Sequence, residues 1–162
     1  MAKKYVKTEF DGLYQGVEDH DEGIGVAYTR KGHYSVFIRM ENPVVQYSAN
    51  IAEYYDAAAL FENIVKSLGE GYSLQKQDVF SRQVFDPKLP DDAKFLARSY
   101  MNFFRGREYT EVQTTLIITQ EIKPTTFGVY DRKRENDFWS KVQKIRDILS
   151  QKKVAYRMMS SE

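Results

Sequence analysis

The apolar residues of this chain change their spacing several times, from every second residue to every third or fourth. The clearest helical stretch has one apolar face, made by residues three and four positions apart: Ala57, Leu60, Phe61, Ile64, Val65 and Leu68. Asn50 and Glu53, three positions later, resemble a capping box, and Gly69 or Gly71 provides the stop. This is the firmest element that the sequence predicts.

β-forming residues dominate five other stretches, at 24–28, 34–40, 72–85, 109–122 and 154–158. A short turn at Lys31-Gly32 joins the first two stretches as a hairpin. Two more helices are predicted. One is capped by Asp91 or Asp92 and ends at Gly106, and the other covers 132–152, with Phe138, Val142, Ile145 and Leu149 in register.

The predicted order of elements contains β-α-β-β-α-β if the middle helix is treated as an insertion. This order predicts an α+β fold of the ferredoxin-like type, an antiparallel sheet with helices on one face, plus an N-terminal β-hairpin and an inserted helix. We expect a polar N-terminal segment over 1–22, a single α+β domain over 23–159 and a tail over 160–162.

Composition limits the function. A hydrophobic share of 42% in 162 residues is enough for one core. Lys and Arg number 24 against 23 Asp and Glu, so the basic excess typical of nucleic-acid binders is missing. The absence of cysteine excludes disulfides and thiol catalysis. No apolar run reaches the roughly 18–20 residues of a membrane span, and no signal peptide is visible, so we expect a soluble cytoplasmic protein.

Catalytic motifs are not found. The glycine pairs Gly23-x-Gly25 and Gly69-x-Gly71 suit turns and helix caps rather than a phosphate loop. His20 and His33 belong to no nucleophile signature, and His33 is expected to be an exposed turn residue. The acidic run 18–22 lacks calcium-loop spacing, so we expect a solvated loop. We expect no catalytic residue, no cofactor and no metal.

Two polar or basic stretches remain. The first mixes cations with rings, as single-strand binders do: Arg98, Tyr100, Phe103, Phe104, Arg105 and Arg107. Tyr100, Phe103 and Phe104 share one helix face, which we expect to pack on the sheet. The second stretch is Lys76-Gln77-Asp78, three polar residues inside a predicted strand, which indicates an exposed sheet face or a bulge.

Three segments, Tyr72–Phe80, Phe95–Tyr100 and Leu116–Thr119, give the chain a family resemblance. In this order they resemble the amino-terminal region of TraG-type proteins, the conjugation ATPases of Bacteroidetes conjugative transposons and relatives of type IV secretion ATPases. The resemblance covers most of residues 20–122. Members of the family carry Walker A and Walker B motifs in a carboxy-terminal RecA-like domain, and this chain lacks both motifs.

The resemblance implies a non-catalytic docking and assembly domain, which makes protein–protein contacts as a peripheral protein at the cytoplasmic face of the inner membrane. The implied partners are other secretion and conjugation components, the protein's own ATPase domain and further copies in an oligomer. Candidate interaction residues are Lys76, Gln77, Asp78, Arg98, Arg105 and Arg107. Two alternatives stay open: a nucleic-acid-binding ferredoxin-like module that acts in DNA transfer, and a small enzyme with an unrecognised site.

Overall fold

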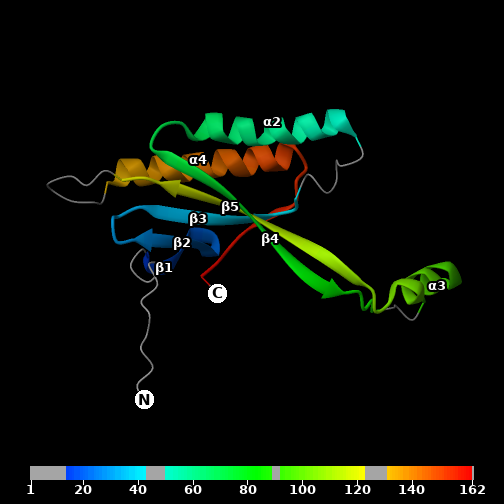
Figure 1. Cartoon of the computed structure of the whole chain (residues 1–162). Coiled ribbons are helices and arrows are strands. Elements are labelled where there is room, and N and C mark those ends of the chain that lie inside the picture. The colour runs from blue at the N-terminus through cyan, green and yellow to red at the C-terminus, as the bar shows by residue number, and fades with distance from the viewer. Residues whose placement is uncertain (1–13, 43–49, 89–91, 123–130, 162) are drawn as a thin grey trace, which may run out of the picture. The chain divides into compact units, whose positions relative to one another are not determined.

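The computed structural model describes residues 14–42, 50–88, 92–122 and 131–161, without the side chains of Tyr14, Asp21 and Glu53. These residues form a mixed α/β fold with three α-helices and a six-stranded antiparallel sheet (Figure 1). The strands are β1 (Tyr14–His20), β2 (Ile24–Thr29), β3 (Tyr34–Met40), β4 (Tyr72–Val84), β5 (Glu108–Gln120) and β6 (Tyr156–Met158). The helices are α2 (Ile51–Leu68), α3 (Phe95–Phe104) and α4 (Arg132–Gln151), with a 3₁₀ turn, η2, at Asp21–Gly23.

The chain divides into two compact units, which we describe separately. The core unit comprises residues 1–77 and 114–162, and the hairpin unit comprises residues 78–113. Strands β4 and β5 each contribute residues to both units. The sequence predicts a single domain over 23–159, and this range includes the hairpin unit and most of the core unit.

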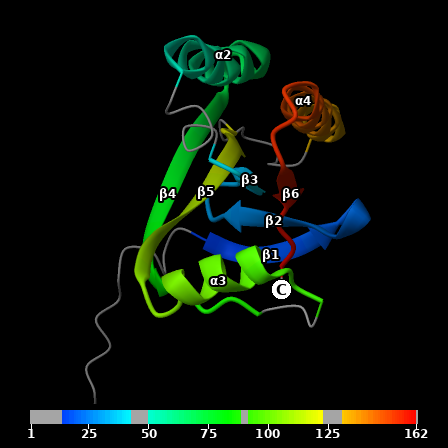
Figure 2. The ribbon, with the colours of Figure 1, turned by 90° about the vertical axis from the view of Figure 1, so that its right-hand side faces the viewer.

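Within the core unit, the strands follow the order β1-β2-β3-β5-β4, and β6 also pairs with β3. Helices α2 and α4 pack beside each other and cover the same side of this sheet (Figures 1 and 2). One cluster of buried side chains fills the space between them, with Ile38, Ile64, Leu116, Phe138 and Ile145 fully buried. The apolar periodicity of the two helices and the alternation of the strands therefore meet in a single core.

The predicted helix boundaries hold where a cap is present. The Asn50 side chain accepts a hydrogen bond of 3.0 Å from the Ala52 amide, and Gly69 closes α2 with a positive φ of 74°. Helix α3 differs, because it begins after Lys94 without a side-chain cap. Asp92 lies in a turn before the helix, and Asp91 lies outside the described residues. The predicted aspartate cap at Asp92 is therefore wrong.

Strand β1 lies within the segment that the sequence indicated as a polar N-terminal stretch. It pairs with β2 from Tyr14 opposite Thr29 to His20 opposite Ile24, with an irregularity near Gly16. Few of its side chains are apolar, so alternation gave no strand signal, but the β2 backbone supplies its hydrogen-bond partners. The N-terminal hairpin of the structure thus has one more strand beside it than expected.

The chain after β6 lies between β2 and β3, beyond the last residue pair of those two strands. Met159 donates its amide to the Phe37 carbonyl and accepts a hydrogen bond of 2.8 Å from the Gly25 amide. Ser161 then donates its amide and its hydroxyl to the Asp19 carboxylate. A Cβ atom at Gly25 would lie 2.7 Å from the Ser160 carbonyl carbon, so this approach requires glycine. Gly25 serves close packing within a strand rather than the turn that its spacing suggested.

Candidate functional site

The six candidate interaction residues do not form one site. Lys76 and Gln77 are exposed on β4 in the core unit, whereas Asp78, Arg98, Arg105 and Arg107 belong to the hairpin unit. The described side chains of the hairpin unit include no buried one. Its organisation depends instead on the β4–β5 ladder, which ends where the Phe85 amide donates to the Arg107 carbonyl.

Helix α3 exposes the aromatic face that we expected to pack on the sheet. None of its residues is buried, and four large apolar side chains are between 63% and 80% exposed: Phe95, Leu96, Tyr100 and Phe103. The expected core role of Tyr100, Phe103 and Phe104 is therefore wrong. An amphipathic pattern identifies which residues share a face, but it does not identify what covers that face.

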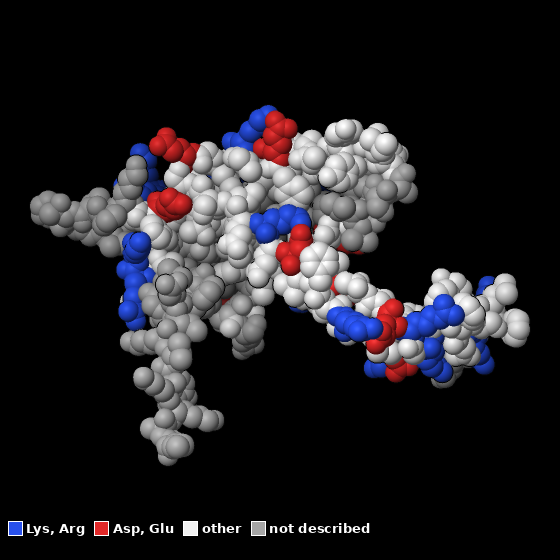
Figure 3. All heavy atoms as spheres, viewed as in Figure 1, with Lys and Arg blue, Asp and Glu red and all other residues white. Residues whose placement is uncertain are grey.

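Three arginines of the hairpin unit lie on α3 or directly after it: Arg98, Arg105 and Arg107. The Arg107 guanidinium sits over the Phe103 ring at 4.1 Å and over the Phe104 ring at 5.0 Å. Arg105 lies 3.6 Å from Asp86, and Arg98 reaches back to the Ala93 carbonyl. Figure 3 shows the resulting surface, with Lys and Arg spheres interleaved with uncharged ones over α3.

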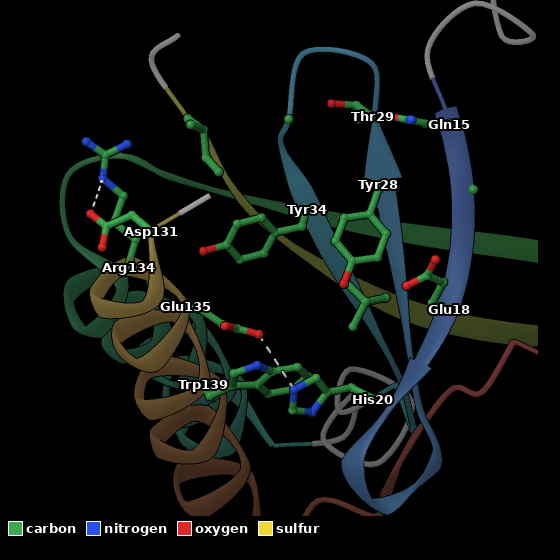
Figure 4. Close-up of a pocket in the computed structure, with 14 residues that line it drawn as sticks. Gln15, Glu18, His20, Tyr28, Thr29, Tyr34, Asp131, Arg134, Glu135 and Trp139 are labelled. Carbon is green, nitrogen blue, oxygen red and sulfur yellow. Dashed lines mark ion pairs between the residues drawn. The ribbon is translucent and has the colours of Figure 1, made fainter. Parts of the chain in front are cut away.

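A pocket of about 550 Å³ lies in the core unit, between the first turns of α4 and the strands β1, β2 and β3. The side chains of the sheet that line it include Glu18 and His20 from β1, Tyr28 from β2 and Tyr34 from β3. Across the pocket, α4 contributes Glu135 and Trp139 (Figure 4). The lining thus combines carboxylates with aromatic rings.

The strand register explains why these sheet residues share a face. Glu18 pairs with Val26 and Gly16 pairs with Tyr28, while Tyr28 in turn pairs with Tyr34 on β3. Residues that are directly opposite in an antiparallel ladder project to the same side of the sheet. Gly16 leaves room beside the Tyr28 ring, because a Cβ atom there would meet nothing within 4 Å.

His20 and Trp139 form one end of the pocket. Their rings stack with centroids 4.3 Å apart and an interplanar angle of 29°. The His20 Nε2 atom lies 3.7 Å from a Glu135 carboxylate oxygen, and both side chains are about one-third exposed. Partial burial reduces the solvent screening of charge at this position.

The pKa values of two tyrosines are shifted by this environment. Burial raises the pKa of Tyr34 to about 12, and the nearby Glu135 carboxylate raises it as well. Burial also raises the pKa of Tyr28, with added contributions from Glu18 and Glu135. The Tyr34 hydroxyl is buried and has no hydrogen-bond partner among the described residues. The pocket therefore shields both phenols from water, and the buried hydroxyl of Tyr34 has no described hydrogen-bond partner.

The acidic run 18–22 is solvated as predicted at Glu18, Asp19 and Glu22, but it forms the end of β1 and the turn η2 rather than a loop. Its described side chains point to different partners, because Asp19 accepts from Ser161 while Glu22 accepts from Arg146 at 3.1 Å. No group of three or more His, Asp and Glu side chains that could hold a metal ion exists among the residues that the structure describes. The carboxylates of the pocket are too dispersed for chelation.

His33 also differs from its prediction as an exposed turn residue. It is half-buried, and its Nδ1 atom accepts a hydrogen bond of 2.8 Å from the Ile122 amide. The side chain thereby connects the β2–β3 turn to the chain after β5. Its role is structural.

Sequence reasoning missed the pocket because its two walls are far apart in the chain. A partial signal existed, since His20 and Glu18 alternate on one strand and Glu135 and Trp139 lie one turn apart on one helix. The described helices include none with the length and apolar character needed to cross a membrane. No protein-family model matches this sequence, and no curated protein matches it either.

Proposed function

We propose that this chain is a docking and assembly module without catalytic activity, and that α3 with its flanking residues is the docking element. The observation that carries the proposal is the exposed face of α3, which presents Phe95, Leu96, Tyr100 and Phe103 and buries none of them. Contiguous exposed apolar surface of this kind is typical of interaction sites in proteins.

The charge around α3 favours an acidic partner. Residues 94–107 contain four cations, Lys94, Arg98, Arg105 and Arg107, and no Asp or Glu. An amphipathic helix of this composition suits an apolar groove with carboxylates on its rim, where the rings provide most of the affinity and the cations set the orientation.

The larger assembly follows from the family resemblance. We propose that the chain is the N-terminal domain of a TraG-type conjugation ATPase, peripheral at the cytoplasmic face of the inner membrane. It contacts other conjugation components and its own ATPase domain. One of the three resembling segments, Phe95–Tyr100, coincides with most of α3, so the resemblance and the exposed surface fall on the same residues.

A ferredoxin-like core is part of this proposal. It is supported by the strand path β6-β3-β5-β4, which follows from the pairing of β6 with β3 and of β3 with β5. Helix α2 follows β3 and helix α4 follows β5, as a split β-α-β pattern requires. Helix α3 is then an insertion between β4 and β5.

Single-stranded nucleic acid is the alternative ligand, favoured by the mixture of cations and rings on α3. Base stacking needs open ring faces. The Arg107 guanidinium already occupies a face of Phe103, so one of the exposed rings of α3 is partly covered. This geometry favours a protein partner.

Binding measurements with purified components test the proposal. The chain is immobilised, and each of the other transfer-apparatus proteins is passed over it. We compare the double substitution Leu96→Ser/Phe103→Ser with Val65→Ser, which removes an exposed apolar side chain from α2 instead. The α3 variant is expected to lose at least about tenfold in affinity for one component, and the α2 variant to bind normally.

Two outcomes would overturn the proposal. In the first, none of the components binds the chain. In the second, the α3 double variant binds as tightly as the unaltered chain. A parallel titration with labelled single-stranded DNA at low and high salt separates the alternative, because phosphate contacts produce a steep salt dependence.

A further inference from the structure

We propose that the pocket between α4 and strands β1, β2 and β3 binds a small organic cation, a substituted ammonium with apolar groups. The site lies within the core unit and is independent of the docking role of α3. Its volume of about 550 Å³ falls in the range of small-molecule sites in proteins.

The charged side chains that line the pocket favour a cation as its ligand. Three carboxylates line the pocket, from Glu18, Asp131 and Glu135, and among the lining residues that the structure describes Arg134 is the one Lys or Arg. Arg134 lies 3.4 Å from Asp131 and offsets that carboxylate. The described lining therefore includes more carboxylates than basic side chains.

The aromatic rings of the pocket favour an organic cation over a metal ion. Tyr28, Tyr34 and Trp139 line the pocket from both sides, and aromatic faces attract substituted ammonium groups through their quadrupole. Alkyl substituents spread the charge and lower the cost of leaving water. A compact metal ion needs several converging oxygen ligands, whereas the described carboxylates do not form such a group.

Tyr34 lines the pocket, whereas its hydroxyl is buried and is not accessible to a molecule of the size of water. Gly16 keeps the space beside Tyr28 open.

The intrinsic fluorescence of the protein reports this site directly. Trp139 is the only tryptophan of the chain and lines the pocket. We titrate the full chain with benzyltrimethylammonium and, separately, with phenylacetate, which has the same ring and the opposite charge. A saturable change in Trp139 emission is expected with the cation at millimolar concentrations, together with at least about tenfold weaker binding of the anion.

Matched substitutions test the assigned carboxylates. Glu18→Gln/Glu135→Gln is expected to weaken binding of benzyltrimethylammonium at least about tenfold, since it removes both charges while keeping the side-chain shapes. Glu70→Gln is the control, because Glu70 is exposed and does not line the pocket. A short peptide with trimethyllysine forms a further arm. Tighter binding of the peptide than of the free ammonium would identify a protein side chain as the source of the cation.

Three results would overturn the inference. One is the absence of any emission change with the cation. Another is equal binding of benzyltrimethylammonium and phenylacetate. The third is unchanged cation binding by the double glutamine variant, with its fold verified by circular dichroism.

Discussion

The imidazole of His20 stacks on the indole of Trp139 with ring centroids 4.3 Å apart, and this contact joins β1 to α4. Neither residue is fully buried, yet together they close one end of the pocket. This aromatic pair therefore adds to the ladder with β2 and to the Ser161–Asp19 hydrogen bonds in holding a strand with few apolar side chains.

His20→Ala is expected to expose the indole face and shift Trp139 emission to longer wavelength. The loss of stacking should lower the free energy of unfolding by about 0.5–1.5 kcal/mol. Emission spectra and urea unfolding measure both effects.

His33→Ala is the matched control, since it removes the other histidine of the chain. It deprives the buried Ile122 amide of its acceptor, so we expect a loss of about 1–3 kcal/mol in stability without a red shift. An unchanged emission maximum in His20→Ala would contradict the assigned contact.

Gly25→Ala is expected to displace the chain that follows β6. The new Cβ atom would lie 2.7 Å and 2.9 Å from the Ser160 carbonyl carbon and oxygen, both of them backbone atoms that cannot rotate away. We expect a loss of about 1–3 kcal/mol in urea unfolding. Carboxypeptidase should also remove the C-terminal residues faster.

Gly16→Ala provides the comparison for Gly25. Its Cβ atom would meet nothing within 4 Å, so the free energy of unfolding should stay within about 0.5 kcal/mol of the original value. Equal midpoints for the two alanine variants would show that the tail does not pack on Gly25.

Local patterns were sufficient for most of the elements, whereas the site depended on tertiary contacts. Phe138, Val142, Ile145 and Leu149 were predicted to share a face of the third helix, and these four are the buried residues of α4. Their spacing alone determines this, because only one face of a helix can meet a sheet.

The exposed face of α3 has an equally strong pattern but no covering layer, so its apolar spacing predicted a core that the structure lacks. The pocket required the pairing of β1 with β2 and the position of α4 over the sheet. Both relationships join residues that are far apart in the sequence, so a local pattern does not reveal them. For this reason the sequence neighbours of His20 gave no sign that it lines a pocket.

Alkaline pH is expected to destabilise the protein through its buried phenols. The pKa of Tyr34 is about 12 in the folded chain, because of burial first and Glu135 second, against about 10 in an unfolded chain. The unfolded state therefore loses its proton first as pH rises. Stability is fully present below about pH 10 and declines toward pH 12.

Urea unfolding from about pH 8 to about pH 11 measures this decline. Tyr34→Phe should reduce it, and at neutral pH should leave stability equal or higher, since it removes a buried hydroxyl without a described partner. Tyr55→Phe is the control, because that ring is 67% exposed. The same decline in both variants would contradict the assignment to Tyr34.

Removal of the hairpin unit is expected to leave the core unit folded. Every residue of the buried apolar cluster lies outside 78–113, from Ile24 on β2 to Val154 after α4. We replace residues 78–113 by Asn-Gly, which favours the tight turn of a two-residue hairpin. The Trp139 unfolding transition should remain cooperative.

Leu116→Ala in the intact chain calibrates this experiment, because truncation of that fully buried side chain should cost about 2–5 kcal/mol in the same transition. Loss of cooperative unfolding in the shortened chain would mean that the hairpin unit supports the core. If the shortened chain unfolds normally but no longer binds its partner, the exposed rings of α3 serve recognition alone. The apolar surface of the hairpin unit would then be explained by its partner rather than by the fold.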